Sequence, residues 1–219
     1  MPNESLYIRR SRSYSADFAA ANPEAFKAFG AFNAAVFADR ELSLRVKELI
    51  AVAVAHITGC PYCIEAHVRK AKAAGVDAAE LFEASAVAAA VSAHSSFYNG
   101  LHALNAYEDS RREELYIRAD LERIGRLEDE APEAYTAFFE YVEGALRPVR
   151  LTLKEKLLIA AASAHVTGSA YSIEIFAARL RDAGASLAEA AEAVLSATAL
   201  AAGGVLAHRV HTIAAYGRE

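Results

Sequence analysis

The chain has 219 residues, of which 54% are hydrophobic, and a formal net charge of -5 at pH 7. Glycine and proline are scarce, at 11 and 5 residues, so the composition is that of a packed globular protein and excludes a disordered or fibrous one. The mild charge and the lack of a dense basic patch argue against nucleic acid as a partner.

Two features of the sequence bear on its location. Residues 1–15 contain arginines but no apolar stretch of the kind that a secretory signal needs. The longest uncharged run, Ala193–Ala207, is shorter than the roughly 20 apolar residues of a membrane-spanning helix. We therefore expect a soluble cytoplasmic protein with no membrane partner, in which cysteines are more often catalytic or metal-binding than structural.

In chain order, residues 23–107 show helical patterns and no alternating strand pattern. Caps, proline and glycine mark the helix ends. Five helices are predicted: from Pro23, from Ser43 to about Ile57, from Cys60 or Pro61 to Gly75, from Asp77 to about Ala93, and from about Ser95 to Tyr107. The predicted fold class is all-α.

The second half of the chain repeats the first. AHITGCPYCIE, residues 55–65, matches AHVTGSAYSIE, residues 164–174, and residues 23–107 match residues 132–216 without a gap. This period is far longer than that of a solenoid repeat. We therefore expect two tandem helical repeats related by a pseudo-twofold axis.

The domain prediction follows from this duplication. Residues 1–109 are expected to form an active repeat and residues 110–219 a degenerate, structural repeat, with a boundary near Asp109 to Glu113. The second repeat is expected to pack against the first and to complete the walls of its pocket.

Four reactive residues occur in the first repeat only. Their positions are occupied by unreactive or weakly reactive residues in the second repeat: Glu48 by Leu157, Cys60 by Ser169, Cys63 by Ser172 and His67 by Phe176. Neighbouring residues such as Gly59 and Ile64 are kept in both repeats. The joint loss indicates that the four residues work as a set.

The spacing of this set predicts a redox site. Cys60, Cys63 and His67 lie at i, i+3 and i+7, on one face of a helix. Glu48 faces them if the preceding helix packs antiparallel across the short break at Thr58. One thiolate would attack a peroxide or disulfide and the other cysteine would close an internal disulfide. His67 is a suitable base, and Glu48 a group that orients it.

Two questions stay open at this level. The helix dipole favours Cys60 as the attacking thiolate, whereas the nearby base His67 favours Cys63, and we give the base more weight. Cys60, Cys63 and His67 could also bind zinc with Glu48 or His56 as fourth ligand. Because no second ligand pair is present, we expect no metal and no bound cofactor; inert buried thiols are the third alternative.

The pattern of Glu48, Cys60-Pro61-Tyr62-Cys63 and His67 resembles the alkyl hydroperoxidase D-like family, within the carboxymuconolactone decarboxylase superfamily. The second repeat resembles the same domain without its active residues. The resemblance implies an all-helical homo-oligomer, a dimer or trimer here, in which Cys63 attacks, Cys60 forms a disulfide with it, and His67 and Glu48 relay a proton.

The activity that this resemblance implies is thiol-dependent reduction of a small hydroperoxide, with an external thiol or dithiol as the reductant. The alternatives are a general thiol-disulfide oxidoreductase or a redox sensor. A zinc-binding module or a lactone decarboxylase is less favoured, because decarboxylases of this superfamily generally lack the cysteine pair.

Three more residues are candidates for the pocket walls: His56, Tyr62 and His94. His56 and Tyr62 recur in the second repeat as His165 and Tyr171, which favours structural roles. His94 aligns with Gly203 and is unique to the first repeat, so it is the candidate for a wall that faces the substrate.

Overall fold

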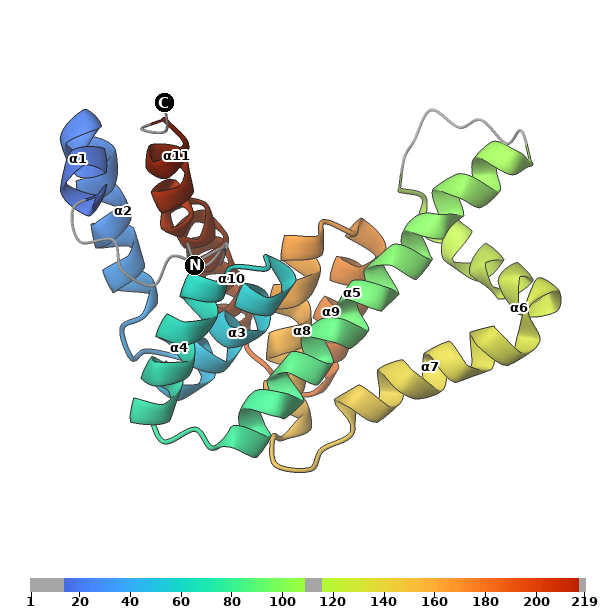
Figure 1. The fold of residues 1–219 in the computed structure, drawn as a ribbon. Helices are drawn as coiled ribbons and strands as arrows, with labels where there is room; N and C mark the ends of the chain where they lie inside the picture. The colour runs from blue at the N-terminus through green and yellow to red at the C-terminus, as the bar shows by residue number, and fades with distance from the viewer. Residues whose placement is uncertain (1–13, 109–115, 217–219) are drawn as a thin grey trace, which may run out of the picture.

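The computed structural model describes residues 14–108 and 116–216, and every regular element within these ranges is helical (Figure 1). The all-α prediction is confirmed for this part of the chain. The elements are α1 (Tyr14–Ala21), α2 (Pro23–Val36), α3 (Leu44–Ile57), α4 (Pro61–Ala73), α5 (Ala78–Tyr107), η1 (Arg118–Gly125), α6 (Arg126–Glu130), α7 (Pro132–Leu146), α8 (Leu153–Thr167), α9 (Ala170–Asp182), α10 (Leu187–Ala207) and α11 (Arg209–Tyr216).

The helices occur in the predicted repeat. Helices α2, α3, α4 and α5 correspond in order and position to α7, α8, α9 and the pair α10–α11. The sequence did not predict α1, η1 or α6, which lie outside the matched segments. The predicted boundary at 109–113 lies outside the described residues.

One predicted helix break is wrong. The fourth and fifth predicted helices, which were expected to meet between Ala93 and Ser95, form the single helix α5 of 30 residues. No glycine or proline occurs from Ala78 to Tyr98, so nothing in that stretch interrupts the ladder of backbone hydrogen bonds. In the second repeat the corresponding helix is interrupted at His208, between α10 and α11.

The ends of the central helices are fixed by local hydrogen bonds that recur in both repeats. Asp77 caps α5 through a reciprocal capping box with Glu80, and Ser186 does the same for α10 with Glu189. Such boxes satisfy backbone donors that the first helical turn otherwise leaves unpaired. They set where each long helix begins, directly after α4 and α9.

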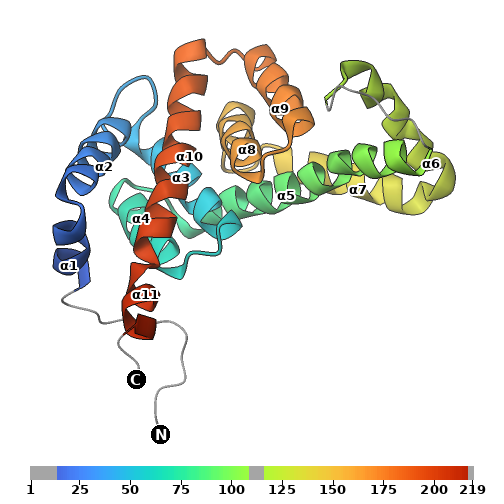
Figure 2. The ribbon, with the colours of Figure 1, turned by 90° about the horizontal axis from the view of Figure 1, so that it is seen from above.

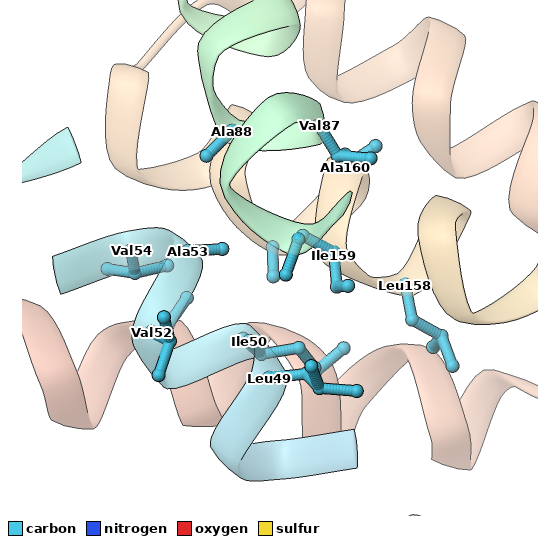
Figure 3. Close-up of a cluster of buried hydrophobic side chains, with 14 of the residues drawn as sticks. Leu49, Ile50, Val52, Ala53, Val54, Val87, Ala88, Leu158, Ile159 and Ala160 are labelled. Carbon is cyan, nitrogen blue, oxygen red and sulfur yellow. The ribbon is translucent and has the colours of Figure 1, made fainter. Parts of the chain in front are cut away.

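The core lies between α3, α5 and α8. Figure 3 shows Leu49 and Ile50 of α3, Val87 of α5 and Ile159 of α8 in one buried cluster. All four side chains are at most 1% exposed. Both repeats contribute to this cluster, so neither repeat has an apolar core of its own in this structure.

The two long helices cross between the repeats. Helix α10 packs on α3 and α4 of the first repeat, and α5 packs on α8 and α9 of the second (Figure 2). Buried ion pairs mark both crossings at equivalent positions. Lys47 Nζ lies 2.9 Å from Glu192 and Lys156 Nζ lies 2.8 Å from Glu83. This reciprocity is what a pseudo-twofold axis between the repeats produces.

The crossing also bears on the most apolar segment. Among the described residues, Leu187–Tyr216 is the one helical stretch long and apolar enough to cross a membrane by length and composition. Core helices of soluble proteins pass the same test. Here α10 packs on α2, α3, α4 and α8, and 33% of the apolar window is buried.

Replacing Lys47 by methionine should lower the free energy of unfolding by about 3 kcal/mol. The change removes the buried ammonium that pairs with Glu192 and donates to the Ala38 carbonyl at 2.6 Å. Urea unfolding at pH 7 measures the loss. The control is Lys154→Met, since that lysine pairs with Glu189 at the surface and should contribute less than about 1 kcal/mol. Equal losses of unfolding free energy in the two variants would contradict the expectation that the buried ion pair stabilises the fold more than the surface pair does.

Candidate active site

The candidate site forms where α3 turns into α4. Thr58 ends α3, and Gly59 adopts a φ of 63°, in the left-handed region that glycine enters without steric cost. Cys60 then caps α4, with Pro61 in its first turn. This tight turn brings α4 back against α3, so that residues far apart on the two helices share one buried interface.

The two cysteines lie at the start of α4 and are joined by a disulfide. Their Cα atoms are 5.3 Å apart, and the side chains are buried, with Cys60 1% and Cys63 6% exposed. The Cys60 sulfur accepts a hydrogen bond from the backbone N–H of Cys63 at 3.2 Å. Backbone donors and the positive end of the helix dipole stabilise negative charge at this position, which favours a thiolate after reduction.

Glu48 and His67 form a buried pair beside the cysteines. His67 Nδ1 lies 2.6 Å from Glu48 Oε2, and the two residues are 9% and 1% exposed. A carboxylate at Glu48 would accept this hydrogen bond from Nδ1, which leaves Nε2 as the ring nitrogen that can exchange a proton. The structure therefore brings Glu48 from α3 to the face of α4 that carries Cys63 and His67.

A cavity of about 180 Å³ opens at Cys63 and His67. Its walls come from α2, α4 and α10, so the second repeat contributes directly to the site of the first. The other lining residues include Phe29, Asn33, Tyr62, Ala66, Leu200 and Gly203. Most of this lining is apolar, and Cys63 and His67 provide its reactive groups.

A second cavity, of about 410 Å³, opens at Cys60. It lies between the turn before α4 and the helices α10 and α11. Its other lining residues are Thr58, Ala201, Gly204, Val205, His208 and Thr212. The sequence did not indicate Gly203, Gly204 or His208 as site residues. Alignment of the two repeats places His94 opposite Gly203 and Ser95 opposite Gly204. This change from a larger residue to glycine is the signal that could have indicated the two glycines as site residues.

The equivalent place in the second repeat is filled by side chains. His94 of α5, which corresponds to Gly203, has its Nδ1 2.8 Å from Ser172 Oγ. Its ring lies 4.6 Å from that of Phe176 and 4.4 Å from that of Tyr98, between ring centroids. His94 therefore does not line the cavity at Cys63; it lies beside Ser172 and Phe176, at the equivalent place in the second repeat. The crossing of α5 onto the second repeat causes this placement.

The environment of His94 also changes its pKa strongly. Burial, reinforced by the positive charge of Arg179, lowers the pKa of His94 from 6.5 to about 4. The side chain is 3% exposed, and its packing excludes the water that an imidazolium would need. The imidazole is therefore neutral in the folded protein at pH values where an unfolded chain already binds a proton.

Acid should weaken the fold through His94. The pKa of His94 is depressed in the folded state, so the unfolded chain binds a proton first as the pH falls. The contribution of neutral His94 to the free energy of unfolding is therefore complete above about pH 6.5 and is lost as the pH falls toward 4. Between pH 7 and 4.5 this amounts to about 2 to 3 kcal/mol. Urea unfolding of wild type and His94→Gln across this range measures the effect, with exposed His56→Gln as control. An unchanged acid dependence in His94→Gln would contradict the assignment.

The remaining candidates for the pocket walls differ in position. His56 is exposed, and its Nδ1 lies 2.8 Å from the Val52 carbonyl oxygen on the same helix. In the second repeat, Nδ1 of His165 makes the same contact with the Ala161 carbonyl oxygen at 2.7 Å. It lines neither of the two cavities. Tyr62 lines the cavity at Cys63, and its hydroxyl lies 3.3 Å from His211 Nε2 on α11. Among the described residues, no group of three or more His, Cys, Asp or Glu side chains is placed to hold a metal ion.

Comparison with known proteins agrees with the duplication. The model of the Carboxymuconolactone decarboxylase family matches residues 23–106 and again residues 132–214. "Uncharacterized protein 4 in cox locus" of Paracoccus denitrificans is 44% identical over 82 residues, which are 37% of this chain and 74% of that protein. The two matched segments cover most of the chain and confirm the internal repeat, so this protein belongs to the carboxymuconolactone decarboxylase family.

Proposed function

We propose that this protein is a thiol-dependent hydroperoxide reductase of the alkyl hydroperoxidase D-like type. The observation that carries the proposal is the buried Glu48–His67 pair, 2.6 Å between Oε2 and Nδ1, on the face of α4 that bears Cys63. A structural disulfide needs no such pair. A peroxidatic thiol does need a base that first accepts its proton and then supplies a proton to the leaving oxygen.

The first step uses Cys63 and His67. His67 Nε2 takes the proton of the Cys63 thiol, and the thiolate attacks the terminal oxygen of ROOH, the one that carries hydrogen. The S–O bond forms, the O–O bond breaks, and ROH leaves with the proton returned by His67. Cys63 becomes a sulfenic acid, while the Glu48 carboxylate stabilises the imidazolium that exists between the two proton transfers.

The second step uses Cys60. Its sulfur attacks the Cys63 sulfur and expels water, which gives the disulfide present in the structure. The cysteines already lie at disulfide distance at the end of a rigid helix, so this closure needs little movement of the chain. An external thiol donor then returns the disulfide to the dithiol state and completes a two-electron cycle.

The cavity at Cys63 supports a small organic hydroperoxide as substrate. Its volume of about 180 Å³ and its mainly apolar lining suit an alkyl group of a few carbon atoms. The contrast with the second repeat adds support. There the reactive residues are absent and the equivalent space is taken by His94 and Phe176, as expected if the cavity serves the chemistry.

The test is consumption of cumene hydroperoxide and tert-butyl hydroperoxide with dithiothreitol as donor. We expect catalytic turnover, and we expect it to be lost after the reduced protein is alkylated with iodoacetamide. Absence of turnover with every hydroperoxide would contradict the proposal. If the protein then still reduced a small disulfide such as cystine, the general thiol-disulfide oxidoreductase would replace the peroxidase.

A further inference from the structure

The two sulfur atoms of the redox pair belong to residues that open onto different cavities. Cys63 lies with His67 on the cavity of about 180 Å³, and Cys60 lies with His208 on the cavity of about 410 Å³. No residue of the first lining recurs in the second. Helix α10 lies between them and contributes to both walls.

Two adjacent glycines of α10 line the two cavities, one each. A Cβ at Gly203 would lie 3.6 Å from the ring of Phe29, in the smaller cavity. A Cβ at Gly204 would lie 3.9 Å from the Cβ of Cys60 and 3.8 Å from the hydroxyl of Thr58, in the larger one. These are ordinary contact distances, so a Cβ alone would fit, whereas a longer side chain would take up space in the cavity that each glycine lines.

The second repeat shows what happens when these positions carry side chains. His94 and Ser95 of α5 correspond to Gly203 and Gly204. His94 fills the space beside Ser172, and the Ser95 hydroxyl lies 2.7 Å from the Thr167 hydroxyl, in the position equivalent to Thr58. Side chains with hydrogen bonds into the site thus stand at both positions in the second repeat, and glycines stand at both in the first.

We propose that the two cavities serve the two half-reactions separately: a hydroperoxide reaches Cys63 through the smaller cavity, and a small thiol donor attacks Cys60 through the larger one. The inference rests on the proposed function for the identity of the oxidant. The route of the donor is independent of that oxidant, because it concerns the disulfide alone.

The chemistry of the reduction favours attack at Cys60. The donor thiolate forms a bond to the Cys60 sulfur, the Cys60–Cys63 bond breaks, and Cys63 leaves as the thiolate beside His67. Leaving-group stabilisation and access to the attacked sulfur both set the rate of thiol-disulfide exchange. His67 lines the same cavity as Cys63 and can protonate that leaving thiolate, while Cys60 is the sulfur-bearing residue on the larger cavity. The second thiol of the donor then attacks the donor sulfur that is bonded to Cys60. This closes the disulfide of the donor and releases Cys60, which takes a proton. The donor is oxidised to its disulfide by two electrons.

His208 is placed to assist this step from the second repeat. It lines the cavity at Cys60, and its ring lies 5.9 Å from that of Tyr62 and 5.8 Å from that of His211 between centroids. An imidazole in this wall can accept the proton of the incoming donor thiol. The cavity volume lies within the range of sites for small organic ligands, so a low-molecular-weight dithiol fits it.

Mapping a trapped mixed disulfide tests which sulfur is attacked. The oxidised protein is mixed briefly with excess 2-mercaptoethanol, quenched with iodoacetamide and analysed by peptide mass spectrometry. We expect mercaptoethanol on Cys60 and the alkyl group on Cys63. The reverse distribution would overturn the proposal, since it would place the donor at Cys63.

Half-reaction kinetics test the routes. Val205 is 77% exposed and lines the cavity at Cys60, so Val205→Trp should slow reduction by dithiothreitol about tenfold relative to oxidation. Gly203→Leu should instead slow oxidation by cumene hydroperoxide by a similar factor. Leu187→Trp, on the same helix and 87% exposed, is the control for a surface tryptophan.

The outcomes separate this proposal from the peroxidase assignment. If each variant slows its own half-reaction, both stand. If no hydroperoxide oxidises the protein but Val205→Trp still slows reduction, the donor route stands and the peroxidase assignment fails. If Val205→Trp slows neither step, or both equally, separate routes are contradicted. His208→Gln is the second variant: it should slow reduction several-fold relative to oxidation, without changing the trapped adduct.

Discussion

Cys63→Ser should abolish hydroperoxide consumption, lowering kcat/KM by about three orders of magnitude or more, as loss of a catalytic nucleophile does elsewhere. Cys63 shares a cavity with His67, and a serine hydroxyl is a far weaker nucleophile than a thiolate. Steady-state assays with dithiothreitol measure the loss. A probe for sulfenic acid should label the oxidised wild type weakly and Cys63→Ser not at all.

Cys60→Ser distinguishes the two thiols. With no thiol added, the reduced variant should consume one equivalent of hydroperoxide per chain and then stop as a sulfenic acid on Cys63, because no second thiol remains to close the disulfide. Ser169→Ala is the matched control, since Ser169 stands at the Cys60 position of the second repeat and its buried hydroxyl has no hydrogen-bond partner. A single turnover in Cys63→Ser instead would reverse the order of the two cysteines.

Loss of the Glu48 carboxylate should lower the rate of oxidation by about two orders of magnitude. Glu48 lies 2.6 Å from His67 Nδ1, where its charge stabilises the imidazolium that forms when His67 takes the thiol proton. Glu48→Gln keeps the size and removes that charge. Stopped-flow oxidation of the reduced protein, followed across pH 5 to 9, measures both the rate and the shift of its pH profile.

The second repeat indicates how Glu48 and His67 can be replaced without unfolding the protein. Glu48→Leu with His67→Phe reproduces the pair Leu157 and Phe176, which the chain already accommodates at the equivalent positions, so the double variant should fold and be inactive. Glu65→Gln is the control, because Glu65 is an exposed carboxylate on α4, the helix of His67. A pH profile unchanged in Glu48→Gln would show that the carboxylate only holds the structure together.

The composition of the site could be predicted because its geometry is local. Cys60, Cys63 and His67 follow one another on a single helix, so their common face follows from the helical period. Glu48 lies only one short turn away, and two helices joined in this way pack antiparallel. The joint absence of all four residues from the second repeat identifies them as a set from the amino-acid sequence alone.

The helix ends were predicted less evenly. Caps and glycines located the start of α3, α4 and α5, because each end depends on side chains within a few residues. The expected break near Ala93 was wrong, since nothing there interrupts a helix. α1, η1 and α6 had no counterpart in the matched segments and no strong local signal, so they were not predicted.

By itself, the amino-acid sequence determined the helical class, the duplication and the four residues of the candidate site. Only the tertiary structure decided which long helix lies over which site. That choice depends on packing between segments about a hundred residues apart, such as Lys47 with Glu192, and no local pattern encodes it. It gives the candidate site the glycines of α10 and the equivalent place in the second repeat His94, because each repeat packs against the long helix of the other.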